Sequence, residues 1–164
     1  MNDINNTNEI KKEEKILEVN DKNANAKIRF KEKRQERKKY RNERKLQSHI
    51  KSAENSIYKA LKDSDLEITQ LLEDIALEIK NNEGSGELIL YKAFSILDEI
   101  YLMAQLKILM AKNDFITNLQ DDLEANLEFA DFEENIVCLK EKSDNVIFTL
   151  EEKITNEKEE LKKI

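Results

Sequence analysis

The stretch ELILYKAFSILDEIYLMAQLKILMAK, residues 87–112, decides the fold class, because its apolar residues recur at the three- and four-residue spacing of an α-helix. The main stripe consists of Leu90, Ala93, Phe94, Leu97, Ile100, Tyr101, Ala104 and Ile108. A second set of apolar residues widens this stripe: Ile89, Ile96, Met103, Leu106 and Met110. A stripe this wide predicts a central helix that contacts its neighbours on more than one side.

The same stretch is long enough to suggest a membrane span, but its charges argue against one. Lys92, Asp98, Glu99 and Lys107 are spread through its length and would be costly in hydrocarbon. The stretch therefore indicates a buried core helix.

Towards the N-terminus, apolar stripes predict a helix over residues 26–62 and a second over 64–79. Ser64 followed by Glu67 fits a capping box, which marks a helix start. Because no glycine or proline separates the two segments, one kinked helix is the alternative. Both readings stay open at the level of the sequence.

Towards the C-terminus, residues 81–86 hold both glycines of the chain and predict a turn. Asn113-Asp114 suggests a boundary before a helix over residues 115–130. A last helix should run from residue 132 to the end, with apolar residues at near-heptad spacing. Together with the absence of proline, this predicts an all-α protein: an antiparallel bundle of about four to five helices, with a long basic N-terminal helix and a long C-terminal helix.

Residues 1–26 differ from the rest in composition. They are rich in asparagine, and their few apolar residues cannot bury a face, so a flexible polar tail or tether is predicted. The run Glu9–Val19 could become helical if something packs on it. Residues 27–164 then form the helical domain.

Charge is distributed unevenly along the chain. The net charge is −7, yet residues 27–51 contain 12 basic and 3 acidic side chains, whereas residues 52–164 contain 12 basic and 26 acidic ones. This basic segment supplies the candidate contact residues for a polyanion or partner: Lys31, Lys33, Arg34, Arg37, Lys38, Lys39, Arg41, Arg44 and Lys45.

As a helix, the basic segment would show cations on every face. Its glutamates, Glu32, Glu36 and Glu43, can each pair with a basic residue three or four positions away. Three interpretations remain: a solvated helix that pairs with the acidic body, contact with a polyanion or host glycan, and binding of nucleic acid. Phe30 and Tyr40 are the only aromatic residues near the cations, which gives base stacking little support.

The residue types that carry catalysis or bind metal are scarce. His49 and Cys138 are single, so an N/S zinc site would need carboxylates for nearly every ligand. Cys138 has apolar neighbours and is expected in the core. Carboxylate clusters such as Asp121/Asp122/Glu124 are interpreted as solvated faces, and Gly84-Ser85-Gly86 lacks the lysine of a phosphate-binding loop. We expect no enzyme activity, no metal and no cofactor.

The composition of the whole chain resembles that of a known family. Lysine, asparagine, isoleucine, leucine and glutamate dominate, proline and tryptophan are absent, and the chain starts with the asparagine-rich NDINNTN of residues 2–8. In these respects the chain resembles the plasmid-encoded, all-helical exported and surface lipoproteins of Borrelia spirochaetes after removal of their leader. The resemblance implies a tether that holds a helical domain off the outer membrane. Members of that family bind host proteins or have no known ligand. The printed sequence has no lipobox or acceptor cysteine, so this expectation requires a leader before residue 2.

Three functional hypotheses follow. The first is a tethered, lipid-anchored surface protein of the outer membrane that contacts a host macromolecule, with no other attachment to a membrane. The second is a cytoplasmic, nucleic-acid-associated plasmid or phage accessory protein that uses residues 27–51. The third is a helical oligomer, such as a homodimer, paired through the last helix or through Leu46–Leu61.

Overall fold

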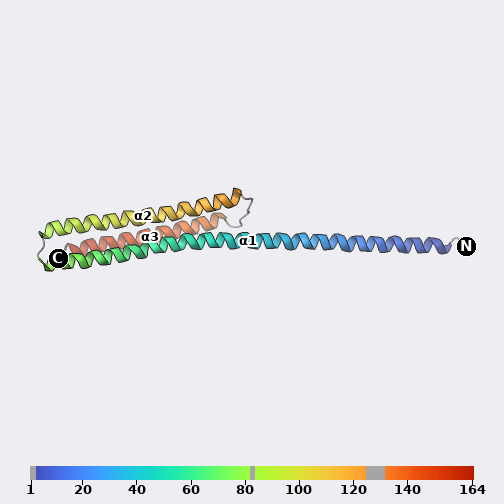
Figure 1. Ribbon diagram of the computed structural model, residues 1–164, viewed down its shortest axis with the longest axis horizontal. Helices are drawn as coiled ribbons and strands as arrows, with labels where there is room; N and C mark the ends of the chain where they lie inside the picture. Colours follow the sequence, from blue (N-terminus) through green and yellow to red (C-terminus); the bar gives the residue numbers. More distant parts are fainter. Residues whose placement is uncertain (1–2, 82–83, 125–131) are drawn as a thin grey trace. The chain divides into compact units, whose positions relative to one another are not determined.

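The computed structural model describes the backbone of residues 3–81, 84–124 and 132–164. It contains three α-helices: α1 (Asp3–Lys80), α2 (Gly86–Glu124) and α3 (Phe132–Leu161), shown in Figure 1. None of the described residues lies in a strand. The predicted all-α fold is confirmed, but the chain forms three long helices where the sequence predicted four to five.

Two predicted helix boundaries are wrong, and of the two readings left open for residues 26–79, a single continuous helix is the one observed. Ser64 does not start a helix; it lies inside α1, is 2% exposed, and its hydroxyl donates a hydrogen bond of 2.9 Å to the carbonyl oxygen of Ala60. Asn113-Asp114 likewise lies inside α2. Neither site contains glycine or proline, and the apolar stripe continues on both sides, so a polar residue alone does not end the helix.

The N-terminal segment also differs from the expectation. The sequence predicts a flexible tail over residues 1–26 and a helix start near Ala26, whereas α1 begins at Asp3. Nothing in this segment breaks a helix, because it contains neither glycine nor proline. Its role as a tether stays a prediction.

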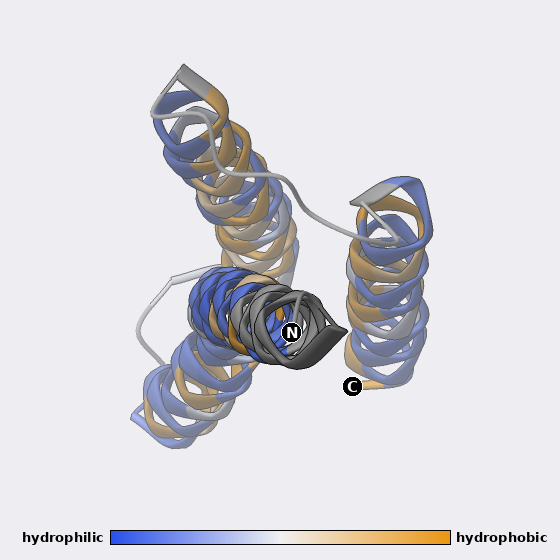
Figure 2. Cartoon of the chain, turned by 90° about the vertical axis from the view of Figure 1, so that its right-hand side faces the viewer, coloured by the Kyte–Doolittle hydropathy of each residue, from blue (hydrophilic) through white to orange (hydrophobic). Residues whose placement is uncertain are grey.

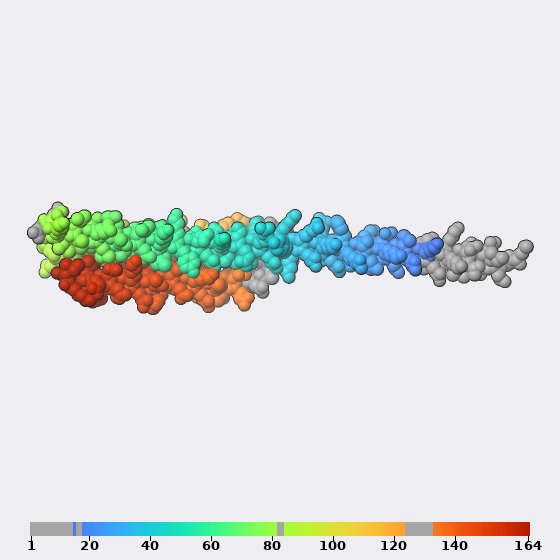
Figure 3. All heavy atoms as spheres, turned by 90° about the horizontal axis from the view of Figure 1, so that it is seen from below, coloured from blue at the N-terminus to red at the C-terminus, as the bar shows by residue number. Residues whose placement is uncertain are grey.

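The chain divides into an N-terminal unit, residues 1–44, and a C-terminal unit, residues 45–164. In the C-terminal unit, ion pairs show the directions of the helices. Glu54 of α1 pairs with Lys142 of α3, and Asp65 pairs with Lys153 at 2.6 Å, so the two helices run in parallel, side by side (Figure 3). The α1–α2 contacts run in the opposite order: Lys45 pairs with Asp122 near the end of α2, whereas Asp63, further along α1, lies 3.8 Å from Lys107.

The core of the C-terminal unit consists of two clusters of buried side chains, both built from all three helices. The first contains Ile68, Leu71, Ile75, Ile89, Ala93, Leu97, Ile100, Ala104, Leu150, Ile154 and Leu161. The second contains Leu46, Ala53, Ile57, Ala60, Ile108, Ala111, Phe115, Leu119, Leu139 and Val146. Hydrophobic and hydrophilic residues alternate along each helix of this unit, as Figure 2 shows. The residues that α3 contributes to the two clusters are those at near-heptad spacing, so they pack within the chain's own core.

The turn between α1 and α2 agrees with the sequence prediction in its described part. Gly84 has φ of 97°, a left-handed conformation that favours glycine. Ser85 then caps α2, because its Oγ accepts a hydrogen bond of 3.3 Å from the backbone N–H of Leu88. Glu87 adds a negative charge in the first turn, where the helix dipole favours it.

Candidate polyanion-binding surface

The basic segment of α1 is fully helical and its cations are accessible. Each of the nine candidate contact residues is exposed: Lys31, Lys33, Arg34, Arg37, Lys38, Lys39, Arg41, Arg44 and Lys45. All of them except Lys45 belong to the N-terminal unit. The structure thus presents these cations to solvent along a single helix.

Cations occur on every side of the helix, as the sequence predicts, but most of them gather on one side. Lys31, Arg34, Lys38 and Arg41 follow one another at spacings of three and four residues, which places them on one side of α1. Lys33, Arg37 and Arg44 flank this row. We call these seven residues the basic face.

The acidic residues of the segment lie on the opposite side. Glu32, Glu36 and Glu43 are spaced by four and seven residues, so they share one side of the helix. Arg29 and Lys39 lie beside these glutamates and away from the basic face. Charge is therefore segregated across the helix, and the basic face carries no carboxylate within its own row.

The predicted pairing of these glutamates with neighbouring cations is not observed. Within the part of the chain that the structure describes, no ion pair involves Glu32, Glu36 or Glu43. The guanidinium of Arg44 instead lies 5.7 Å from the ring centroid of Tyr40, a cation–π distance. Together with Glu36, Arg37 and Arg41, these two residues line a shallow hollow on the surface of the N-terminal unit.

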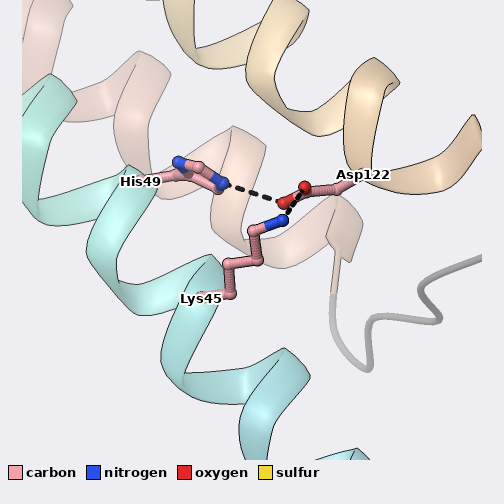
Figure 4. Close-up of polar contacts among 3 residues, drawn as sticks. All are labelled: Lys45, His49 and Asp122. Atoms are coloured by element: carbon pink, nitrogen blue, oxygen red, sulfur yellow. Dashed lines mark hydrogen bonds and ion pairs between the residues drawn. The ribbon is translucent and has the colours of Figure 1, made fainter. Parts of the chain in front are cut away.

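Lys45, the last cation of the candidate set, is used differently. Its ammonium group forms an ion pair with the carboxylate of Asp122, and His49 Nε2 lies 2.8 Å from Asp122 Oδ2 (Figure 4). Lys45 and His49 are four residues apart and therefore lie on the same side of α1. This cluster joins α1 to α2 inside the C-terminal unit. Lys45 is thus held in an ion pair within the fold, whereas none of the other eight candidates forms an ion pair among the described residues.

Asp122 is buried, so its assignment to a solvated carboxylate cluster is wrong. Burial raises the pKa of this carboxyl group, but the hydrogen bonds from Lys45 and His49, and their charges, outweigh that effect and lower the pKa below its ordinary value. The sequence contained a signal for this: Asp122 follows Phe115 and Leu119 at helical spacing, so it continues a core stripe.

The remaining candidate chemistry is sparse among the described residues. Cys138 is exposed, so the expectation of a core cysteine is wrong; its apolar neighbours Ile136 and Val137 are themselves partly or fully exposed on α3. Across the described ranges, no three His, Cys, Asp or Glu side chains gather closely enough to hold a metal ion. In the same ranges, no helix has a stretch apolar and long enough to cross a membrane.

Comparisons with known proteins place this chain in no family. No family model, no curated protein and no solved structure matches it. The resemblance to Borrelia surface lipoproteins therefore stays a prediction. The functional argument depends on the chemistry of the surface itself.

Proposed function

We propose that this chain is a non-enzymatic helical protein that binds a polyanionic macromolecule along the basic face of α1. The observation that carries this proposal is the distribution of charge around residues 27–45 of α1: seven accessible cations lie on one side, and the three glutamates of this segment lie on the other, with Arg29 and Lys39 beside them. A row with about one cation or more per helical turn offers repeated contacts to a polymer that carries a phosphate or sulfate group on each unit.

The types of cation support the same function. Arg34, Arg37, Arg41 and Arg44 supply planar guanidinium groups that bind phosphate or sulfate oxygens in pairs. The exposed ring of Tyr40 adds one stacking surface next to Arg44. Since one aromatic ring offers little base readout, binding should depend on the backbone charge of the polymer and not on its sequence.

A salt titration tests the proposal. Binding to mixed-sequence duplex DNA, single-stranded RNA and heparin is measured by fluorescence anisotropy at several salt concentrations. Contact with about four to seven phosphates predicts a slope of log K against log salt of about −4 to −6 for duplex DNA. Absence of binding to all three polymers at low salt would overturn the proposal.

The chain offers a matched control for the binding surface. The variant Arg34→Gln/Arg41→Gln removes two cations from the basic face, and Arg29→Gln/Lys39→Gln removes two from the glutamate side. The first variant should lower affinity about tenfold or more and reduce the salt slope by about 2, whereas the second should leave the slope unchanged. Equal losses in both variants would show that net charge, and not the basic face, determines binding.

The polymer that binds most tightly distinguishes between the two cellular locations predicted from the sequence. Tighter binding to DNA or RNA supports a cytoplasmic nucleic-acid-associated protein, whereas tighter binding to heparin supports a surface protein that contacts host glycans. The sequence of the native gene upstream of codon 2 gives independent support: an apolar leader ending in cysteine favours the surface setting.

A further inference from the structure

Helix α2 is apolar on two opposite sides. One side contributes buried residues such as Ala93, Leu97, Ala104 and Ile108 to the core. The opposite side carries a second group of apolar residues that are 45–61% exposed, which we call the outer patch: Leu102, Met103, Leu106, Leu109 and Met110. At 100° per residue, this group is centred roughly opposite the core stripe.

The outer patch is not explained by the fold of the chain. A helix that is apolar all round is normally covered on every side, and the sequence indeed predicts neighbours on more than one side of this segment. In the described structure, the outer patch instead faces solvent. A contiguous exposed apolar surface of this kind marks an interaction site.

The spacing of the outer patch shows where its centre lies. Leu102 and Met110 lie four residues before and after Leu106, and Met103 and Leu109 lie three residues before and after it. The patch is therefore centred on Leu106. In an isologous dimer the same patch of both copies meets about a two-fold axis, so Leu106 would lie beside that axis.

Charges beyond the patch favour an antiparallel pairing. Lys92 lies 14 residues before Leu106 and Asp121 lies 15 residues after it, and both are exposed. Viewed along the axis of α2, both residues are rotated from Leu106 in the same direction, Lys92 by about 40° and Asp121 by about 60°. When Leu106 meets Leu106 of an antiparallel second copy, Lys92 lies opposite Asp121 of that copy.

A parallel pairing would oppose like charges instead. Glu99, which lies about 20° from Leu106 around α2, would face Glu99 of the second copy, which is unfavourable. In the antiparallel pairing, Glu99 faces Asn113 of the second copy, and the apolar centre gains a polar rim. Within the described residues, neither Lys92 nor Asp121 has an ion-pair partner in its own chain.

We propose that the outer patch of α2 is the interface of an antiparallel homodimer whose two-fold axis passes beside Leu106. This interface is independent of the basic face, because it belongs to another helix and to the C-terminal unit. The proposed function and the dimer can therefore fail separately.

The mass of the full chain in solution is the first test. Sedimentation equilibrium from low to high micromolar concentration should show a monomer–dimer equilibrium. Leu106→Glu should weaken the dimer about 100-fold or more, because it removes the central apolar contact and places two carboxylates at the axis. Leu66→Glu is the matched control, since Leu66 on α1 is even more exposed than Leu106 (62% against 48%) but lies outside the outer patch.

A charge swap tests the register. Lys92→Glu and Asp121→Lys should each weaken the dimer several-fold, and the double variant Lys92→Glu/Asp121→Lys should restore it. Circular dichroism of each variant shows whether the helices remain folded. Additive losses in the double variant would contradict the antiparallel register.

Disulfide cross-linking distinguishes the two directions. In a Cys138→Ser background, Leu106→Cys should form a dimer on oxidation, because residues beside the axis come within disulfide reach. Leu88→Cys should not: Leu88 lies five full turns before Leu106 on the same side of α2, so its two copies would be about 50 Å apart. Cross-linking of both variants would indicate a parallel pair. A monomer at every concentration, or a dimer unaffected by Leu106→Glu, would overturn the proposal.

Discussion

Two parts of α1 contrast in how their side chains are used. Residues 18–41 are exposed without exception, whereas the part from Leu46 onward buries a regular stripe that includes Ala53, Ile57 and Ala60. The same secondary structure thus has two origins. In the C-terminal unit, tertiary packing stabilises the helix. In the basic segment, the helix depends on helix-forming residues and on the absence of glycine and proline.

The largest expected effect comes from testing a buried and an exposed apolar residue of α1 side by side. Ile57 is 0% exposed and Phe30 is 73% exposed. Ile57→Ala should lower the free energy of unfolding by about 2–5 kcal/mol, because it leaves a cavity in the core. Phe30→Ala should change it by less than about 0.5 kcal/mol.

Chemical denaturation monitored by circular dichroism at 222 nm measures both changes. A loss of several kcal/mol for Phe30→Ala would break the contrast, because it would mean that the basic segment also contributes packing to the fold.

The next effect concerns the cation that belongs to the fold. Lys45→Ala should lower the free energy of unfolding by about 1 kcal/mol, since the side chain of Lys45 is half-exposed and its pair with Asp122 is partly screened. Asp122→Ala should cost about 1–3 kcal/mol, because it removes the partner of both Lys45 and His49. Lys38→Ala, in the basic face, should have no measurable effect on stability.

The pH dependence of stability gives an independent test of Asp122. Its pKa is lowered in the folded state, because the hydrogen bonds from Lys45 and His49 outweigh the effect of burial. The carboxylate therefore stabilises the fold above the unfolded-state pKa of about 4, and this contribution is lost as the pH falls through the lower folded-state value. The difference in unfolding free energy between the parent and Asp122→Asn should shrink between about pH 5 and pH 2. A difference that stays constant over this range would contradict the assignment.

The smallest expected effect comes from comparing a serine at a helix start with a serine in a helix interior. Ser85→Ala should cost about 1 kcal/mol, since Ser85 caps α2. Ser64→Ala should change stability by less than about 0.5 kcal/mol, because the hydroxyl of Ser64 donates to Ala60 within a continuous helix and alanine has the higher helix propensity. If both substitutions cost the same, α1 is interrupted at Ser64.

The sequence predicts the fold class and much of the core, because helical periodicity reports directly which face is buried. The stripe from Leu90 to Ile108, the turn at Gly84 and the start of the last helix at residue 132 all agree with the structure. The two boundaries predicted at Ser64 and at Asn113-Asp114 do not exist, because a serine or an Asn-Asp pair occurs in helix interiors as well as at helix starts.

The candidate site was predictable only in part. The cations of residues 31–45 are evident from composition, but their separation from Glu32, Glu36 and Glu43 requires a continuous helix with known phase. The pairing of Lys45 with Asp122 joins residues 77 positions apart, which single-sequence periodicity cannot supply. The outer patch shows the same limit: the sequence indicates an apolar surface but not whether the chain itself covers it.

The most direct test of the contrast within α1 is a chain that begins at Lys45 and lacks the N-terminal unit. Both core clusters consist of residues from Leu46 onward, so this shortened chain should unfold cooperatively with a free energy close to that of the full chain. It should also lose its affinity for duplex DNA and heparin at low salt. A shortened chain that fails to fold, or one that keeps its polyanion affinity, would contradict the division of α1 into a binding segment and a packing segment.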